Sequence, residues 1–486
     1  MDSIIHIIAG TWSRKETQER KVMLENVTLE IIRSWQNRTG NVNSTEDILA
    51  WITDLNENTH VKIEECDLTE DSFWYYDRTA GEVLNRKKKF FSITGIRCMG
   101  GDSFVREQPV IVQPEIGYLG IVCRKIDGVL NFLMQAKIEP GNVNCVQISP
   151  TIQATKSNFL RVHGGKLPTY FELFADSANH QVLYDQVQSE QASRFYKKRN
   201  RNMIMYLDED IEIYPNFKWM TLGQIKELMK VDNLVNMDTR TVLSGLPFTA
   251  VTGDSAAERE IREAFTDQTL YKSLFSADAG ANLPGIFQKL NDYKMFAETS
   301  TEFIPLSELS DWTADEHGIT CKKEADFMVR YYSIEIDGRE VRQWKQPLFK
   351  AIGMATFGLL SRVHDGTREY LVKIKPEIGS FDFAEVGPTV QWEPTHDHTD
   401  DNAADRLFRS KLQQGEGVKV DVILSEEGGR FYQEQNRNVM IYIDENELPD
   451  VPAGYVWTDY AALGYMVQIN NCLNIQLRNL MSLIDL

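Results

Sequence analysis

Charged, amide and hydroxyl side chains alternate with apolar ones between residues 133 and 155, in two segments typical of strands. Lys137 and Glu139 stand two positions apart, so in an extended chain both point to the same face. A lysine beside a glutamate can supply a cation that polarises a carbonyl and a carboxylate that moves a proton. The polar face predicts the floor of a pocket, and it carries Gln135, Lys137, Glu139, Gln147, Ser149, Thr151, Gln153 and Thr155.

A second polar segment follows at residues 188–202. It begins with amides around Glu190 and ends in a dense cluster of bases, although the whole chain carries a net charge of -19. A local cationic cluster in an acidic protein favours an anion site over general attraction to polyanions. A solvated, charged helix end is the alternative interpretation. The segment contains Gln188, Glu190, Gln191, Arg194, Lys197, Lys198, Arg199, Asn200, Arg201 and Asn202.

Composition excludes several classes of protein. The 71 acidic residues exceed the 52 basic ones, which disfavours a nucleic-acid-binding surface. The apolar run at residues 4–9 is too short to span a membrane and lacks a basic flank, so we expect no membrane association. Six cysteines without a CxxC pair fit a reducing cytoplasm and provide neither a disulfide framework nor a thiolate metal site.

The segments around the polar face must position it. Helical spacing is evident in residues 16–56, where Ser44 and Asp47 form a capping-box-like start. Strands are expected from Phe90 to Asp208, and a helix over residues 219–246.

An internal repeat organises the chain. At an offset of 238 residues (375 minus 137) Lys137 falls on Lys375, and Glu139 falls on Glu377. Asp127-Gly128 coincides with Asp365-Gly366 at the same offset. Many further matches at nearly constant offset predict two copies of one α+β module. We expect an N-terminal helical and aromatic extension (1–89), a first repeat (90–250), a connecting segment (251–325) and a second repeat (326–486).

The two copies differ in charge. The basic run 197–199 of the first becomes Gln433-Glu434-Gln435 in the second, and the segment around His163 has no convincing counterpart. This asymmetry predicts one working site and one altered site. The second set of candidates comprises Lys375, Glu377, Gln391, Glu426, Arg430 and Asn436.

These motifs resemble a known family. The segments QAKIEPGN, QISPTIQAT, QSEQ and KKRNRN, with SEEGGRFY and NRN in the second copy, are similar to NDP-hexose 2,3-dehydratases. The resemblance implies tandem modules with a Nudix-like mixed sheet, usually in a homodimer. The chain lacks the Arg-Glu-x-x-Glu-Glu helix of Nudix hydrolases, so we do not expect diphosphate hydrolysis.

The resemblance implies that water is eliminated from dTDP-4-dehydro-6-deoxyglucose, with loss of the C2 hydroxyl. Such an elimination requires a base, a proton donor and a polarising group, but neither a metal nor another cofactor. We expect Glu139 or Glu190 as the base, His163 or Tyr170 as the acid, and Lys137 at the enolate oxygen. The product is a reactive diketone, so a ketoreductase is the expected functional partner.

Substrate binding has candidates of its own. Arg194 and Arg199 are expected at the diphosphate, since guanidinium groups match phosphate oxygens. The remaining candidate ligands are Gln147, Thr151, Gln153, Thr155, Asn158, Gln188, Gln191, Asn200 and Arg201.

Structural interpretations of the same residues stay open. Lys137 and Glu139 could form a purely structural ion pair, and His163 could belong to a mobile loop. The amides could form a strand-stabilising ladder, and Asn200 could cap a turn. The His396-x-His398 spacing suits a metal, but no third ligand is evident from the sequence, so no metal is expected. A binding protein that senses a sugar nucleotide without converting it, or a nucleoside diphosphate hydrolase, are the alternative functions.

Overall fold

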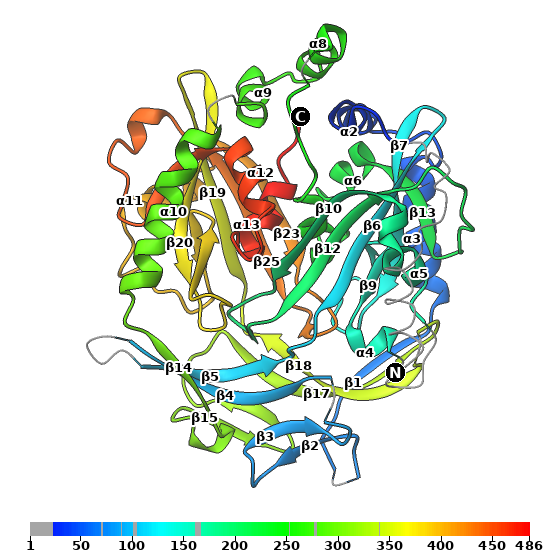
Figure 1. The fold of residues 1–486 in the computed structure, drawn as a ribbon. Helices are drawn as coiled ribbons and strands as arrows, with labels where there is room; N and C mark the ends of the chain where they lie inside the picture. Colours follow the sequence, from blue (N-terminus) through cyan, green and yellow to red (C-terminus); the bar gives the residue numbers. More distant parts are fainter. Residues whose placement is uncertain are drawn as a thin grey trace.

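The computed structural model describes residues 23–69, 71–88, 90–100, 105–160, 167–251, 253–276, 279–339 and 341–486. Two large sheets stand side by side, and two smaller sheets lie together beneath them (Figure 1). The helices α12 (Tyr460–Val467) and α13 (Ile475–Ser482) lie between the large sheets (Figure 1). The helix α10 (Ala279–Phe296) packs against α12 and one of these sheets, and α11 (Ala403–Gln414) covers the opposite face of that sheet.

The first large sheet has the strand order β10-β12-β6-β7-β13, with β8 paired to β7 and β9 to β6. It is mixed, because β12 and β6 run parallel while its other neighbours are antiparallel. Asp127 and Gly128 turn the β6–β7 hairpin with positive φ at both positions, as a type I′ turn requires. The strands are β6 (Gly117–Ile126), β7 (Val129–Ile138), β8 (Val146–Ser149), β9 (Ile152–Ala154), β10 (Gln181–Ser189), β12 (Arg199–Tyr206) and β13 (Phe217–Thr221).

The second large sheet repeats this arrangement. Its order β23-β25-β19-β20 matches β10-β12-β6-β7, and β25 and β19 are again parallel. Asp365 and Gly366 form the same turn with positive φ. The tandem duplication is therefore confirmed in three dimensions. The strands are β19 (Ala355–His364), β20 (Thr367–Pro376), β21 (Ala384–Gly387), β22 (Val390–Trp392), β23 (Val418–Ser425), β25 (Gln435–Tyr442) and β26 (Tyr455–Asp459).

The two smaller sheets exchange one strand each. In the first, β14 (Ser300–Ile304) of the second half pairs with β4, and in the second, β1 (Val61–Glu65) of the first half pairs with β17. This reciprocal exchange joins the halves through main-chain hydrogen bonds. The other strands are β2 (Trp74–Asp77), β3 (Glu82–Asn85), β4 (Ser92–Met99), β5 (Val105–Val112) and β11 (Phe195–Tyr196) in one sheet. The other sheet contains β15 (Trp312–Asp315), β16 (Gly318–Cys321), β17 (Phe327–Ile336), β18 (Gln343–Ala351) and β24 (Phe431–Tyr432).

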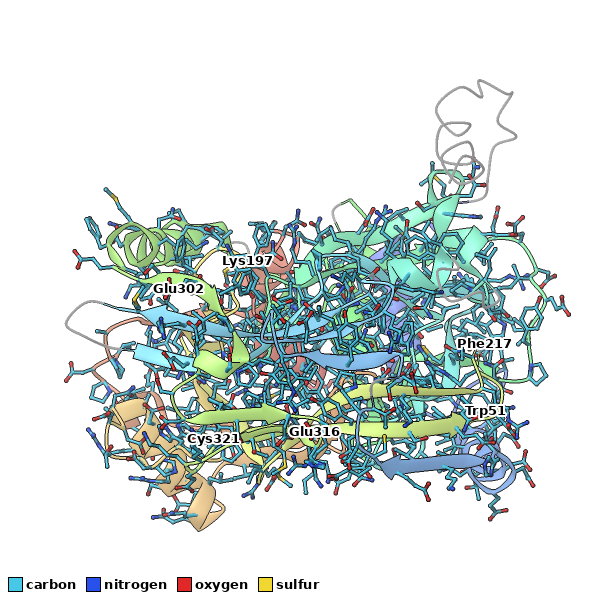
Figure 2. All side chains as sticks on the ribbon, turned by 90° about the horizontal axis from the view of Figure 1, so that it is seen from below. Trp51, Lys197, Phe217, Glu302, Glu316 and Cys321 are labelled. Atoms are coloured by element: carbon cyan, nitrogen blue, oxygen red, sulfur yellow. The ribbon has the colours of Figure 1, made fainter. Side chains whose placement is uncertain are left out.

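The helices close the outer faces and the junction. Ser44 and Asp47 form the predicted capping box at the start of α3. Trp51 of α3 donates to the backbone oxygen of Pro215, and it lies near Phe217 in Figure 2. The helices are α2 (Val27–Gln36), α3 (Thr45–Asn58), α4 (Lys156–Phe159), α5 (Phe171–Ala175), α6 (Leu222–Leu228), α7 (Met237–Leu243), α8 (Ser255–Glu263), α9 (Gln268–Leu274), α10 (Ala279–Phe296), α11 (Ala403–Gln414), α12 (Tyr460–Val467) and α13 (Ile475–Ser482).

The expected helix over residues 219–246 is wrong at its start and in its middle. Residues 217–221 pair with β7 as β13, because Trp219 and Met220 are buried there as strand residues. Two short helices, α6 and α7, follow, and each has its own N-cap at Thr221 and Asn236. The split matters because it places the start of α7 beside the polar face of β8.

Strands occur earlier than Phe90. The hairpin β2–β3 begins at Trp74, and the hairpin β15–β16 begins at Trp312, 238 residues later (312 minus 74). Figure 2 labels Glu316, in the turn of the β15–β16 hairpin, and Cys321, at the end of β16. No helix among the described residues is long and apolar enough to cross a membrane.

Candidate functional site

A cavity of about 510 Å³ lies between the first large sheet and elements of the second repeat. Its floor comes from β6, β7 and β9, and its opposite wall comes from the β17–β18 hairpin and the segment after β23. Both repeats are therefore needed to enclose it. Its polar lining residues include Lys137, Glu139, Glu190, Lys198, Asn200, Asp238, Arg339, Glu427 and Arg430.

Lys137 and Glu139 form the predicted pair at the end of β7. The Lys137 Nζ lies 2.8 Å from Glu139 Oε1 and donates to the backbone oxygen of Gln153 at 3.0 Å. Arg339 of the second repeat also contacts Glu139 Oε1, at 3.2 Å. Burial opposes ionisation of Glu139, but Arg339 and Lys137 outweigh it and lower its pKa to about 2. Glu139 is thus a fixed anion that orients two cations.

Glu190 and Lys198 occupy the next part of the floor, linked through Asn200. The Asn200 amide donates to Glu190 Oε1 at 2.6 Å and accepts from Lys198 Nζ at 3.0 Å. Burial raises the pKa of Glu190 above its ordinary value, against the opposing charge of Lys198. Burial also lowers the pKa of Lys198 to about 8. Both groups therefore titrate closer to neutrality than in water.

Glu427 and Arg430 reach the cavity from the second repeat. Burial raises the pKa of Glu427 to about 7, against the opposing charge of Arg430. Arg430 packs over the rings of Phe90 and Phe91, and its Nη2 donates to Gln113 Oε1 at 3.1 Å. Glu427 is half-buried and lines the cavity, and its Oε1 accepts from the Gly429 amide at 2.9 Å.

A close backbone contact fixes this segment. The Gly141 amide donates to the backbone oxygen of Gly428 at 2.7 Å, and the Gln433 amide donates to Gly141 at 2.7 Å. A Cβ on Gly141 would lie 1.6 Å from the Phe431 backbone oxygen. The glycine of the repeated Lys-x-Glu-x-Gly motif is required by this docking of one repeat on the other.

Asp238 completes the polar lining. It lies in the first turn of α7 and is 2% exposed, and its Oδ2 has no hydrogen-bond partner. Burial, reinforced by the charges of Glu190 and Glu427, raises the pKa of Asp238 well above its ordinary value. The raised pKa favours the protonated form of Asp238, and in that form the carboxylic acid can donate a hydrogen bond.

Aromatic and basic residues from both repeats line the same cavity. Trp344 of β18 donates from Nε1 to Gln346 Oε1 at 2.9 Å, which holds the indole in place. The exposed side chain of Lys87 lies on the first-repeat side. The other aromatic lining residues are Phe73, Trp74, Phe90, Tyr118 and Phe195, and Lys345 is a further basic one.

The equivalent region of the second repeat has the same scaffold and different side chains. Asn436 donates to Glu426 Oε1 at 2.6 Å, as Asn200 does to Glu190. Gln391 donates to Glu377, and Trp392 stands where the first repeat has Ala154. Burial raises the pKa of Glu434 to about 7 and that of Glu426 to about 8. An acidic cluster therefore replaces the mixed charges of the first repeat.

The structure brings together eight of the residues predicted from sequence. The lining of the cavity includes the predicted residues Lys137, Glu139, Gln153, Thr155, Asn158, Glu190, Asn200 and Arg430. Arg430 was expected to serve the second site, but it faces the first because the segment after β23 crosses over. His163 lies outside the described residues.

Several predicted ligands of the diphosphate and sugar are placed elsewhere. Arg194 pairs with Glu393 at 3.0 Å and packs over Phe327, and Arg199 packs over Phe381. Arg201 pairs with Asp185. None of these three arginines lines the cavity, because each is held against a neighbouring element.

The other polar candidates outside the cavity have structural hydrogen bonds. Tyr170 donates from its hydroxyl to the backbone of Glu212 at 2.7 Å, and Thr151 bonds to the backbone of β6 and β7. Gln147 donates to Ser425 and Gln188 to the backbone of Val467, so both amides join the two repeats. Gln191 faces Glu434. None of these five side chains lines the cavity.

Sequence reasoning missed Asp238, Arg339 and Glu427. The sequence predicted one continuous helix over residues 219–246, so it did not indicate that Asp238 lies in the first turn of a separate helix. The sequence could have indicated Glu427, because this residue aligns with Gln191 and adds a carboxylate that the first copy lacks. Arg339 lies in a hairpin of the other repeat, and no local pattern indicates that crossing.

Comparison with known proteins agrees with the two-repeat organisation of the chain. A family model described as NDP-hexose 2,3-dehydratase matches residues 45–246 and again residues 285–484. The chain belongs to the NDP-hexose 2,3-dehydratase family. The two matched segments contain every charged residue that lines the cavity.

Three relatives carry the name dTDP-4-dehydro-6-deoxy-alpha-D-glucopyranose 2,3-dehydratase. The protein of Saccharopolyspora spinosa is 36% identical over 444 residues, which is 90% of both chains. That of Streptomyces violaceoruber is 35% identical over 447 residues, 91% of this chain and 97% of its own. That of Amycolatopsis orientalis is 34% identical over 451 residues, 91% of this chain and 90% of its own. As a dehydratase family member, the chain matches these relatives over both repeats.

Proposed function

We propose that this protein is a dTDP-4-dehydro-6-deoxy-D-glucose 2,3-dehydratase. It eliminates water across C2 and C3 to give dTDP-3,4-didehydro-2,6-dideoxy-D-glucose. The observation that carries this function is the cavity lined by the cations Lys137 and Arg339 together with carboxyl groups of raised pKa, at Glu427 and Asp238. The family membership and the names of three relatives support the substrate.

The C4 ketone makes the C3 hydrogen acidic. A base takes the C3 proton, and the electron pair of that bond forms an enolate with its charge on the C4 oxygen. The enolate then returns its electrons, which form the C2–C3 double bond and expel the C2 hydroxyl with a proton from an acid. The resulting enol takes a proton at C2 and loses the proton of its C3 hydroxyl, and so becomes the 3-ketone.

We assign the base to Glu427. It is half-buried in the cavity, and its pKa of about 7 leaves a useful fraction ionised near neutral pH. Glu139 is the weaker candidate, because its pKa of about 2 makes it a poor proton acceptor. Glu190 is nearly covered and bonded to Asn200, so we assign it to the positioning of Lys198.

Lys137 is assigned to the C4 oxygen. Glu139 and the Gln153 backbone engage two of its three N–H donors, which leaves one for a substrate oxygen. Burial of a cation where negative charge develops stabilises the enolate more than water does. Glu139 then acts by holding Lys137 and Arg339 rather than by moving a proton.

Asp238 is assigned as the acid that protonates the departing C2 hydroxyl. Its raised pKa favours the protonated form, and the residue lines the cavity. The remaining cations and Trp344 suit the diphosphate and the thymine of the carrier, through charge and ring stacking. Arg194 and Arg199 are not assigned to the diphosphate, since both are held outside the cavity.

Four further properties belong to the proposal. Homodimer assembly and a downstream ketoreductase follow from the family resemblance and the fragile product. A Nudix-like origin of each repeat is kept on the same ground. A cytoplasmic location fits the six free cysteines.

We also place the start of each repeat before β2 and β15 rather than at Phe90 and residue 326, since the hairpins β2–β3 and β15–β16 occupy equivalent positions in the two repeats.

The test is incubation of purified protein with dTDP-4-dehydro-6-deoxyglucose in deuterated water, without added metal or nicotinamide, followed by mass spectrometry and NMR. We expect loss of one water and one deuterium gained at C2. Bound but unchanged substrate would favour a sensor, and release of dTMP would indicate a hydrolase. Either result would overturn the proposed elimination.

A further inference from the structure

A cluster in the second repeat, far from the polar cavity in the sequence, has the composition of a metal site. His396, His398 and Asp401 each offer one ligand atom, and these atoms lie within 4.8 Å of one another. All three belong to the segment between β22 and α11. The sequence indicated the two histidines, and the structure adds the third donor that the sequence could not place.

The distances within the cluster suit chelation. His396 Nε2 lies 3.0 Å from Asp401 Oδ1, and His398 Nδ1 lies 3.1 Å from Asp401 Oδ2. A tetrahedral zinc with bonds of about 2.0–2.2 Å separates its ligand atoms by about 3.3–3.6 Å. A small opening of the present hydrogen bonds therefore admits the ion, which takes the place of the shared protons.

The surroundings hold the donors in position. Asp401 is 7% exposed, and Arg409 Nη1 contacts its Oδ2 at 3.1 Å, leaving Oδ1 toward His396. The His396 ring stacks on Trp392, and the His398 ring meets Trp392 edge-on. His398 has φ of 63°, a left-handed conformation that non-glycine residues rarely adopt. Such a backbone is retained where surrounding contacts compensate for its strain.

We propose that His396, His398 and Asp401 bind one Zn²⁺ ion, with water in the remaining position. Two imidazoles and one carboxylate are donors that zinc accepts readily. The ion would fasten the segment 395–401 onto Trp392, which stands where the first repeat has Ala154. The site is therefore structural and specific to the second repeat, and it does not depend on the proposed elimination.

The test uses tag-free full-length protein, because a polyhistidine tag would bind the same ions. After dialysis against a chelator, Co²⁺ is added while visible absorption is recorded, and Zn²⁺ is then added as competitor. We expect d–d bands of a low-symmetry Co²⁺ site at one ion per chain, their loss on addition of Zn²⁺, and a higher melting temperature with Zn²⁺.

The variants H396A and H398A should lose both the bands and the Zn²⁺-dependent rise in melting temperature. Each side chain is about one-third exposed, so both variants should fold, and their melting temperatures in chelator check this. The matched control is H364A, which removes an exposed histidine that also contacts carboxylates, Asp365 and Glu445. Absence of bands in the wild type, or bands that survive in H396A and H398A, would overturn the zinc site.

Discussion

The two repeats place different side chains on the same strands, and the differences concentrate at the cavity. Lys198 of the first repeat corresponds to Glu434, and Asp238 corresponds to Gln476. Glu427, in contrast, corresponds to Gln191 of the first repeat. One region therefore mixes cations with carboxyl groups, whereas the other gathers carboxyl groups around Arg194. Duplication preserved the scaffold, and the charges around the two regions then diverged.

The comparison also shows how the repeats depend on each other. The segment after β10 contributes Glu190 to one region and Gln191 to the other, and the segment after β23 divides Glu426 and Glu427 in the same way. Consecutive residues thus serve opposite repeats. A single repeat could not enclose the cavity, because Arg339, Glu427 and Arg430 come from its neighbour.

The largest expected effect is on Glu427. Glu427→Gln removes the proposed base while keeping the size of the side chain, so kcat should fall by about 1,000-fold. Exchange of the C3 hydrogen with deuterated solvent, followed by NMR, should be lost together with elimination. The matched control is Glu426→Gln, the adjacent residue that faces the second repeat, for which we expect a change of at most about threefold. Equal losses in both variants would contradict the division between the regions.

Asp238→Asn should produce a different defect. Without the proposed acid the C2 hydroxyl leaves slowly, and kcat should fall by about 100-fold. The base is still present, so the C3 hydrogen should continue to exchange with deuterium while water loss is blocked. Measuring both processes in one NMR sample separates Asp238 from Glu427. Loss of exchange in Asp238→Asn would remove it from the acid role.

The fold and part of the cavity could be predicted from sequence for identifiable reasons. The repeat offset, the Asp-Gly turns and the Lys137–Glu139 pair are local patterns, and all three are present in the structure. The cavity as a whole could not be predicted, because its opposite wall comes from the other repeat. Arg339 is a charged residue in a loop, and nothing in the sequence around it indicates that it contacts Glu139, 200 residues away in the chain (339 minus 139).

The glycine contacts test whether docking is equally tight on both sides. A Cβ at Gly141 would lie 1.6 Å from the Phe431 backbone oxygen, and at Gly379 1.8 Å from that of Phe195. Gly141→Ala and Gly379→Ala should each lower the free energy of unfolding by roughly 3 kcal/mol, measured by urea denaturation. Gly464→Ala is the control, since nothing lies within 4 Å of its Cβ. A stable Gly379→Ala protein would show that the second contact is looser than the first.

The smallest effect concerns pH, and its sign differs between the repeats. The pKa of Glu139 is about 2 in the folded protein, below its ordinary value, because Arg339 and Lys137 outweigh burial. Its contribution to stability is therefore present above about pH 4.5 and is lost as the pH falls toward 2. Burial raises the pKa of Glu434 to about 7, so its contribution is present below about pH 4.5 and is lost as the pH rises through 7.

Glu434→Gln mimics the protonated side chain at every pH and should remove this alkaline loss. The free energy of unfolding of the variant should exceed that of the wild type by about 2 kcal/mol at pH 8, and the two should converge near pH 5. Urea denaturation from pH 5 to 9 measures the difference, with Glu298→Gln as an exposed control. A gap that does not change with pH would mean that Glu434 is ionised in the folded protein. Arg194 would then neutralise it, and the second region would resemble the first in charge after all.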